Sequence, residues 1–417
     1  MDKLRITGGK RLRGRVAIAG AKNAALPALA ATLLTAEPVE LTNLPKVRDV
    51  RTMLRVLEQL GAEASERPDA GMEIRVERIA SFEAPYDLVK TMRASVLALG
   101  PLVARHGRAR VSLPGGCALG ERPIDLHIEG LRKLGAEIGV QHGYVEASAE
   151  RLRGTRFDFR IQSVTGTANL MMAATLAEGT TILGNCAKEP EVCDLAKLLV
   201  SMGASIRGAG GDEIVIEGRE RLHGAAHRVI ADRIEAGTYL VAGALAGDPV
   251  ELTGCEIEHM KPILQQLGHA GVPIAVEDDV VRVSVPRKLE SHDLRTAPHP
   301  GYPTDMQAQY GALMTQAQGT SMITETVFER RFMHVGELAR MGADIRIDGH
   351  SYVVVGPSGL TGAQVMATDL RASACLVLAA LVADGITVID RIYHLDRGYE
   401  AMEEKLQALG ADVERIR

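Results

Sequence analysis

The chain has 417 residues, with 48 Lys and Arg against 53 Asp and Glu, which gives a formal net charge of −5 at pH 7. At roughly 150 residues per domain, this length predicts two or three domains, and the absence of a dense basic run argues against a nucleic-acid partner. With no Trp, 8 Tyr and 5 Phe, the chain has few rings for stacking on bases, so we expect ligands to be bound by charge and backbone groups.

The N-terminal sequence MDKLRITGGKRLRGR is charged and lacks the apolar core of a signal peptide. Apolar stretches such as Ala372 to Ala383 are shorter than the roughly 18 residues that a membrane span requires. Five cysteines, an odd number, indicate a reducing compartment. We therefore predict a cytoplasmic protein with no membrane partner, and the sequence does not indicate an oligomeric state.

A repeat of about 70 residues runs along the whole chain. In each copy, strand, apolar helix and strand are followed by an amphipathic helix that ends at a glycine, then by a strand and a hairpin. Each of these glycines is expected at the C′ position, where φ is positive. The six glycines are Gly61, Gly135, Gly203, Gly271, Gly342 and Gly410. The expected apolar helices include 24–34, 94–104, 169–177, 237–246 and 372–383.

The repeats form two sets of three. PVELT at Pro38 returns at Pro249, and the last copy stops at ADVERIR without its hairpin. The segment LRITGGKRLRGRVAIAG near the N-terminus resembles the hairpin before Asp232, so we expect an N-terminal hairpin to complete the last repeat. This predicts an α/β fold with buried helices and two domains, residues 22–229 and residues 1–21 with 230–417.

Charged residues recur just before the apolar helices. Lys22, Arg93, Arg233 and Arg371 stand at helix N-termini, where a cation is unfavourable for stability. Residues that break a stability rule mark functional sites, and converging helix N-termini attract anions. The alternative at each junction is that Asp, Ser or Asn only caps its helix. Asp305 and Asp369 are expected to pair with Arg331 and Arg371 rather than to bind a metal.

Cys117 lies in a glycine-rich loop five residues before Arg122, where basic neighbours lower a thiol pKa. This position favours acid or nucleophile chemistry, although a lone loop cysteine is usually incidental. Cys375, in an apolar helix, is expected to pack in the core. The sequence has no phosphate-binding P-loop, zinc-protease or dinucleotide-binding motif, and its histidines have no metal-ligand spacing.

Seven motifs together resemble the family of UDP-N-acetylglucosamine 1-carboxyvinyltransferases, over the whole chain. They are GAKNAALP at Gly20, PYDLVKTMRAS at Pro85, LPGGCALGERPIDLH at Leu113, HPGYPTDMQAQ at His299, ETVFERRFMHV at Glu325, MATDLRAS at Met366 and RIYHLDRGYE at Arg391. The resemblance implies a two-domain inside-out α/β barrel. It also implies transfer of enolpyruvyl from phosphoenolpyruvate to the 3′-hydroxyl of UDP-N-acetylglucosamine, the first committed step of peptidoglycan synthesis, with no cofactor and no metal.

The same resemblance implies roles for individual residues. Those expected to bind phosphoenolpyruvate are Lys22, Asn23, Arg122, Arg371 and Arg397. Those expected to bind UDP-N-acetylglucosamine are Arg93, Arg122, Pro123, Ile124, Asp125, Leu126, Ser163, Asp305 and Val327. The catalytic residues are expected to be Cys117, Asp305, Lys22 and Arg397, with Cys117 as the proton donor to C3 of phosphoenolpyruvate and the site of fosfomycin attack. The chain has SVTGT from Ser163, where the family has SVGAT.

Two alternatives stay open at this point. The first is the related enzyme that transfers enolpyruvyl to shikimate 3-phosphate, against which the Cys117 loop argues. The second is a repeat scaffold without catalytic activity. A loop thiol near arginines has no purpose in a scaffold, so we favour the enzyme.

Overall fold

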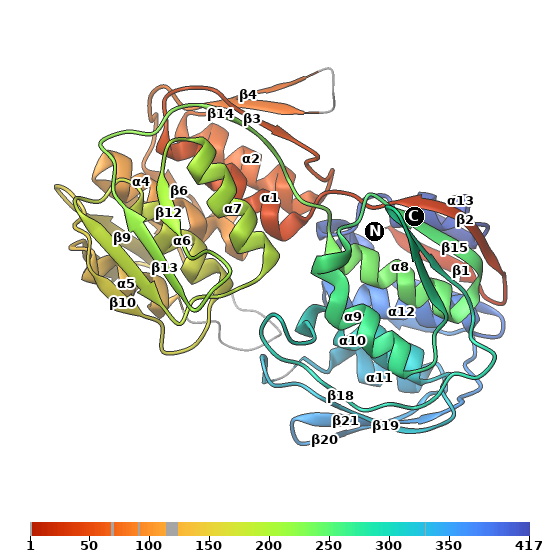
Figure 1. The fold of residues 1–417 in the computed structure, drawn as a ribbon. Coiled ribbons are helices and arrows are strands. Elements are labelled where there is room, and N and C mark those ends of the chain that lie inside the picture. Colours follow the sequence, from red (N-terminus) through yellow and green to blue (C-terminus); the bar gives the residue numbers. More distant parts are fainter. Residues whose placement is uncertain (1, 68–70, 91, 114–123, 330) are drawn as a thin grey trace. The chain divides into compact units, whose positions relative to one another are not determined.

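The computed structural model describes residues 2–67, 71–90, 92–113, 124–329 and 331–417. Among these, contacts divide the chain into two compact units: residues 2–19 and 231–417 form unit 1, and residues 20–113 and 124–230 form unit 2. In Figure 1, unit 1 carries the red N-terminal end and the green-to-blue C-terminal part of the chain. The division into two domains, residues 22–229 and residues 1–21 with 230–417, stays a prediction.

In the described residues, each unit has three four-stranded sheets, and all six sheets have the same pattern. The first two strands of each are parallel and the other neighbours are antiparallel. The sheets of unit 2 are β14 (Ala225–Arg228), β3 (Val39–Thr42), β5 (Met72–Arg75) and β4 (Glu63–Glu66); β6 (Glu83–Ala84), β7 (Arg108–Ser112), β9 (Tyr144–Ser148) and β8 (Glu137–Gln141); and β10 (Arg156–Asp158), β11 (Thr180–Gly184), β13 (Glu213–Glu217) and β12 (Ser205–Arg207).

The sheets of unit 1 are given in the same way, each starting from its parallel edge strand. The first is β2 (Leu12–Ala17), β15 (Gly247–Thr253), β17 (Val280–Val283) and β16 (Ile274–Glu277), and the second is β18 (Leu294–Arg295), β19 (Gly319–Thr324), β21 (Ser351–Gly356) and β20 (Asp344–Asp348). The third is β22 (Gln364–Met366), β23 (Ile386–Asp390), β1 (Lys3–Thr7) and β24 (Asp412–Ile416). The predicted α/β class and six repeats are confirmed. Within the described residues these sheets stay separate, and none closes on itself into a continuous barrel.

Apolar helices fill the interior of each unit, as their composition predicts. In unit 2 they are α1 (Lys22–Ala31) with η1 (Thr32–Leu34), η2 (Arg93–Ala98) with α4 (Leu99–His106), and α6 (Val164–Ala174). In unit 1 they are α8 (Arg233–Ala246), η3 (Thr304–Met306) with α10 (Gln307–Met314), and α12 (Leu370–Val382). Every residue of α8 and α10 is buried, and each unit has its own hydrophobic core.

The helices at the other helical position of the repeat are α2 (Arg48–Leu60), α5 (Asp125–Lys133), α7 (Pro190–Ser201), α9 (Ile257–His269), α11 (Met333–Arg340) and α13 (Met402–Ala408). Two short helices, α3 (Tyr86–Val89) and η4 (Ile392–Arg397), precede η2 and α13. The six repeat glycines follow the six helices at that position with φ between 83° and 108°, which confirms the predicted C′ positions. No helix in the described ranges has both the length and the apolar character to cross a bilayer.

The two N-terminal strands join different sheets, which corrects the expected N-terminal hairpin. β1 lies between β23 and β24 and completes the last repeat, with Leu4 opposite both Ile389 and Arg415. β2 instead pairs in parallel with β15. Correspondingly, β14 precedes α8 of unit 1 but pairs with β3 of unit 2. The strand before α1 and the strand before α8 are thus exchanged between the units.

Candidate active site

Asp305 is held between two arginines at the start of the α10 segment. Arg331 Nη1 lies 2.7 Å from Asp305 Oδ1, and Arg371 Nη2 lies 2.7 Å from Asp305 Oδ2. The arginine side chains are 7% and 3% exposed, whereas that of Asp305 is 24% exposed. The predicted pairing of Asp305 with both arginines is therefore confirmed, and the carboxylate is the group of the three that faces solvent most.

The charge of Arg371 is stable in its buried position. Burial by itself lowers the pKa of this guanidinium, but the negative charge of Asp305, with smaller contributions from Tyr399 and Asp232, outweighs burial and raises the pKa. The guanidinium also lies over the ring of Tyr399, 5.6 Å from its centroid. Arg371 thus presents a permanent, positioned cation at the N-terminus of α12.

A buried hydrogen-bond network joins the N-terminal turns of the unit 1 helices beneath this ion pair. Gln309 Nε2 donates to the backbone oxygen of Asp305 at 3.0 Å and lies 3.2 Å from the Tyr399 hydroxyl. Thr238 of α8 lies 2.9 Å from the same hydroxyl. Gln309 lies in the first turn of α10 and Thr238 in the second turn of α8, while Tyr399 follows η4. The network therefore fixes α8, α10 and the Arg371 region relative to one another.

Glu325 organises the loop that carries Val327. The side chain is buried and accepts hydrogen bonds from Thr304 Oγ1 at 2.7 Å, Thr296 Oγ1 at 2.8 Å and the Val327 N–H at 2.7 Å. Thr304 in turn accepts from Arg331 at 3.0 Å. Val327, predicted to contact the acceptor, keeps an exposed side chain on this fixed backbone.

Three of the polar residues at the helix junctions are helix caps, as the structural alternative proposed. Asp232 accepts from the N–H groups of Ile234 and Glu235, and Asp369 accepts from those of Arg371 and Ala372. Ser163 accepts from the Gly166 N–H at 3.1 Å. Asp369 therefore contacts the backbone of Arg371, in contrast to Asp305, which binds its guanidinium.

In unit 2, Lys22 is the first residue of α1. Its Nζ lies 3.7 Å from Oδ2 of Asp49, which is buried in the first turn of α2. The Lys22 side chain is 13% exposed, so the aspartate holds a mostly buried cation at a helix N-terminus. Asn23 follows on α1 and is half-buried, and Arg93 begins η2.

Three of the residues predicted to bind the acceptor lie at the start of α5. Ile124 precedes this helix, Asp125 begins it and pairs with Arg160, and Leu126 packs its side chain in the core. The Leu126 N–H donates to the Asp125 side chain at 3.0 Å. His127, the next residue, is buried and contacts Thr165 of α6, which brings the N-terminal ends of α5 and α6 together.

Cys117, Arg122 and Pro123 lie outside the described residues. The four other cysteines are free thiols, and Cys375 is fully buried in α12, as predicted. Burial raises the pKa of Cys186 to about 12 and also raises the pKa values of Cys193, Cys255 and Cys375. These four thiols are therefore poor nucleophiles at neutral pH. In the described ranges, no group of acidic, His or Cys residues has the arrangement of a metal site.

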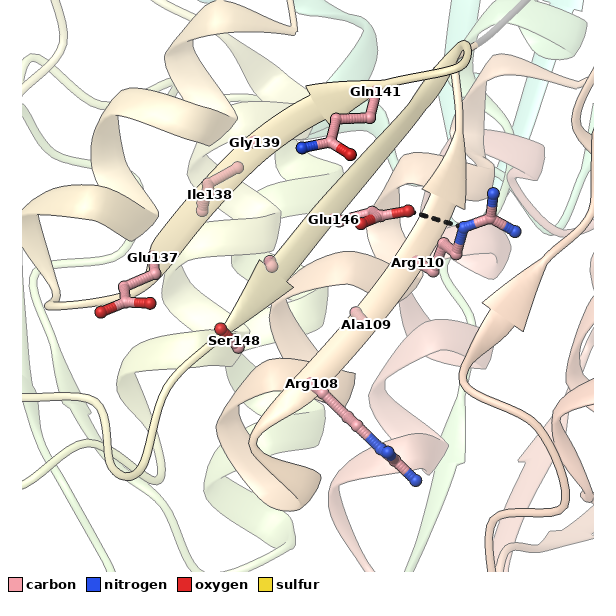
Figure 2. Close-up of a pocket in the computed structure, with 10 residues that line it drawn as sticks. Arg108, Ala109, Arg110, Glu137, Ile138, Gly139, Gln141, Glu146 and Ser148 are labelled. Carbon is pink, nitrogen blue, oxygen red and sulfur yellow. Dashed lines mark hydrogen bonds and ion pairs between the residues drawn. The ribbon is translucent and has the colours of Figure 1, made fainter.

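A hollow of about 530 Å³ lies on the sheet of β7, β8 and β9 (Figure 2). None of the predicted site residues lines it. Figure 2 shows Arg110 joined to Glu146, at 2.9 Å, and Arg110 also pairs with Glu83 and stacks on Tyr144. Arg110 is already paired with two carboxylates and Glu137 also lines the hollow, so this hollow is a poor candidate for an anion site.

The sequence interpretation missed the supporting residues of both units. In unit 1 these are Thr238, Glu325, Gln309 and Tyr399, and in unit 2 they include Asn169 and His127. Several share one signal, a polar residue inside or beside an otherwise apolar helix, which is unfavourable unless its hydrogen bonds are satisfied. That signal identifies candidates but does not say which partners they meet.

Comparisons with known proteins agree with this architecture. The family described as EPSP synthase (3-phosphoshikimate 1-carboxyvinyltransferase) matches residues 6–406. The enolpyruvyl transferase NikO from Streptomyces tendae is 30% identical with a TM-score of 0.91, covering 99% of this chain and 98% of that chain. An EPSP synthase from Acinetobacter baumannii is 18% identical with a TM-score of 0.79 over 100% of each chain, a likeness of fold alone.

Proposed function

The chain belongs to the EPSP synthase family of enolpyruvyl transferases, and on this premise we propose that its acceptor substrate is UDP-N-acetylglucosamine. The reaction transfers enolpyruvyl from phosphoenolpyruvate to the 3′-hydroxyl and releases phosphate, which serves peptidoglycan synthesis and thereby cell division. The observation that carries this choice is the loop sequence LPGGCALGERPIDLH with Cys117. A cysteine in such a loop supplies a proton donor, which the addition step requires.

Cationic residues of both units are proposed to bind phosphoenolpyruvate through its phosphate and carboxylate. They are Lys22, Arg122, Arg371 and Arg397, with Asn23 as a hydrogen-bond donor. The fixed charge of Arg371 and the mostly buried charge of Lys22 support this role, because a positioned cation loses little freedom on binding. Arg397 ends η4, next to the Gly398–Tyr399 segment on which Arg371 packs.

The acceptor is proposed to bind residues at the starts of α5 and α6, and Asp305 is proposed to act on its hydroxyl. The residues concerned are Arg93, Arg122, Pro123, Ile124, Asp125, Leu126, Ser163, Asp305 and Val327. Both oxygens of Asp305 accept from arginines, and its side chain is 24% exposed. Asp305 is thus suited to accept a hydrogen bond from the attacking hydroxyl.

The proposed chemistry is an addition followed by an elimination. The 3′-oxygen attacks C2 of phosphoenolpyruvate and its proton passes toward Asp305, while the Cys117 thiol gives a proton to C3, which becomes a methyl group. The product of addition is a tetrahedral ketal. Loss of a proton from the methyl group and cleavage of the bond from C2 to the phosphate oxygen then give the enol ether and free phosphate.

Release of phosphate from phosphoenolpyruvate tests the acceptor directly. We expect release with UDP-N-acetylglucosamine and none with shikimate 3-phosphate. Release with shikimate 3-phosphate alone would overturn the proposed acceptor in favour of the activity for which the matching family is named. Release with neither would revive a scaffold role.

Covalent labelling by fosfomycin tests the role of Cys117. We expect one label on the wild-type chain and none on Cys117→Ala, because burial keeps the four other thiols protonated. The far-ultraviolet circular dichroism spectra of the two proteins should coincide. A label that persists on Cys117→Ala would show that a different thiol is the reactive one.

A further inference from the structure

Thr165 occupies the place where the chain departs from the family's SVGAT sequence. It is the second residue of α6 and is exposed, two residues after Ser163. The next residue, Gly166, has no room for a side chain, because an added Cβ would lie 2.9 Å from Ser163 Oγ and 3.0 Å from the Phe159 ring. The crowded position thus holds the glycine, and the exposed position gains a hydroxyl group.

A buried hydrogen-bond chain leads to this hydroxyl from inside unit 2. The Gly100 N–H donates to Oδ1 of Asn169 at 2.9 Å, which fixes the orientation of the Asn169 amide. Its Nδ2 then faces Nδ1 of His127 at 2.9 Å. Because Nδ2 can only donate, Nδ1 of His127 accepts and its Nε2 carries the proton.

The Nε2 proton of His127 is directed at Thr165. The two atoms Nε2 and Thr165 Oγ1 are 3.3 Å apart, so the imidazole donates and the threonine oxygen accepts. His127 is 2% exposed and Asn169 is fully buried. Burial also lowers the pKa of His127 to about 4, so the ring is neutral at pH 7 and keeps this tautomer.

Thr165 can still donate its own proton. A hydroxyl that accepts from His127 has one O–H left to donate, and none of the described side chains takes it. The opposite tautomer would place the Nδ1–H of His127 against the Nδ2–H of Asn169, and a flipped Asn169 amide would place its Nδ2–H against the Gly100 N–H. The buried chain therefore favours a single direction along its length. An exposed O–H with a fixed oxygen is suited to bind an acceptor oxygen of a ligand.

We propose that Thr165 is a specificity-determining residue that donates its hydroxyl proton to an oxygen of the acceptor's diphosphate, and that His127 and Asn169 are positioning residues that act through it. The inference rests on the proposed function, which has the acceptor bind at Ser163. A hydroxyl donor to a charged oxygen is worth more than one to a neutral oxygen, so the acceptor's affinity should depend on it.

Steady-state kinetics with UDP-N-acetylglucosamine and phosphoenolpyruvate test this inference. In Thr165→Val, which keeps the shape but loses the hydroxyl, the KM for UDP-N-acetylglucosamine should rise about tenfold or more. The kcat and the KM for phosphoenolpyruvate should stay at wild-type values. Thr165→Ser should restore the KM for the nucleotide sugar to within about threefold of wild type, because it returns the hydroxyl at some loss of rotamer preference.

Thr180→Val is the matched control. Its hydroxyl also makes one side-chain hydrogen bond, to Glu217 at 2.9 Å, on an exposed strand of the same unit. We expect wild-type kinetic constants for this variant. The His127 tautomer is checked separately by ¹⁵N NMR of the imidazole, where protonated Nε2 and unprotonated Nδ1 are expected, and the opposite tautomer would overturn the inference.

The possible failures are distinguishable. An unchanged KM for the nucleotide sugar in Thr165→Val overturns the inference and leaves the proposed function intact. A loss that affects kcat and both KM values equally overturns it too, because it indicates a structural effect. A wild-type enzyme that uses shikimate 3-phosphate alone overturns the proposed acceptor, and the inference with it.

Discussion

Asp305 shares its charge with two buried guanidiniums, so its substitution acts on both stability and rate. In Asp305→Asn, Arg331 and Arg371 lose their common counter-ion, and the free energy of unfolding should fall by about 3 kcal/mol. If the carboxylate accepts the hydroxyl proton, kcat should fall by about 10²–10⁴-fold in the folded variant. Urea denaturation and phosphate release measure the two effects.

Asp390→Asn is the control for this substitution. Asp390 pairs with Lys3 at 2.8 Å, but both side chains are about two-fifths exposed, so solvent screens the pair. Its loss should change the free energy of unfolding by at most about 1 kcal/mol and leave kcat unchanged. An Asp305→Asn enzyme with wild-type kcat would remove Asp305 from the proposed mechanism.

Two fully buried histidines make stability depend on pH. Burial lowers the pKa values of His127 and His334 to about 4, below the value of an unfolded histidine. The unfolded state therefore binds more protons between pH 6.5 and pH 4, and stability falls as the pH falls through this window. Each histidine should lower the free energy of unfolding by about 2 kcal/mol between pH 7 and pH 5.

His127→Gln isolates one of these contributions. The amide keeps a donor and an acceptor but does not titrate, so the loss of stability from pH 7 to pH 5, measured by urea denaturation at each pH, should be smaller by about 2 kcal/mol. His350→Gln, at an exposed turn, should keep the wild-type dependence. A wild-type dependence in His127→Gln would mean that His127 is not a buried neutral group.

At the level of the repeated element, the helix-ending glycines contribute through backbone conformation. Gly135 has φ 96° and no atom within 4 Å of an added Cβ, so Gly135→Ala tests the conformation alone. Its free energy of unfolding should fall by about 1–2 kcal/mol. Gly336, exposed within α11, also has free space, and Gly336→Ala should stabilise by about 0.5–1 kcal/mol. Thermal denaturation measures both variants, and equal changes in the free energy of unfolding for Gly135→Ala and Gly336→Ala would contradict this explanation.

The elements were the most predictable level of the molecule. Apolar composition identified the interior helices, and the glycine spacing identified the six helix ends, because both patterns follow from local conformation and burial. The contacts of Thr238, Asn169 and Glu325 were not predictable. Each depends on which helices meet at a given depth, and this is decided by packing between residues far apart in the sequence. Asp305 and Arg371 were identified because charged residues at helix junctions are rare enough to be conspicuous.

At the scale of the whole molecule, β1 is an interior strand of the last sheet. Deletion of residues 2–8 would leave β24 without a neighbour and expose an edge of β23. We expect the shortened chain to lose a folded unit 1 and to be insoluble, measured by the soluble fraction on expression and by circular dichroism.

A circular permutant supplies the matching control. Lys3 is opposite Ile416, so a short linker can join the two ends, and new ends can be opened between Asp278 and Asp279 in an exposed turn. This protein keeps β1 and should fold with wild-type activity. A soluble, active deletion variant would show that β1 is dispensable.

The exchange of β2 and β14 also bears on how such a chain could have arisen. In a half-length ancestor with this connectivity, the β3-like or β15-like strand would have had one neighbour in its sheet instead of two. Two copies that exchanged their first strands, as domain-swapped dimers do, would have completed each other's sheets. Fusion of the two genes would then have made the exchange permanent, so that each half of the sequence supplies one strand to a sheet of the other half.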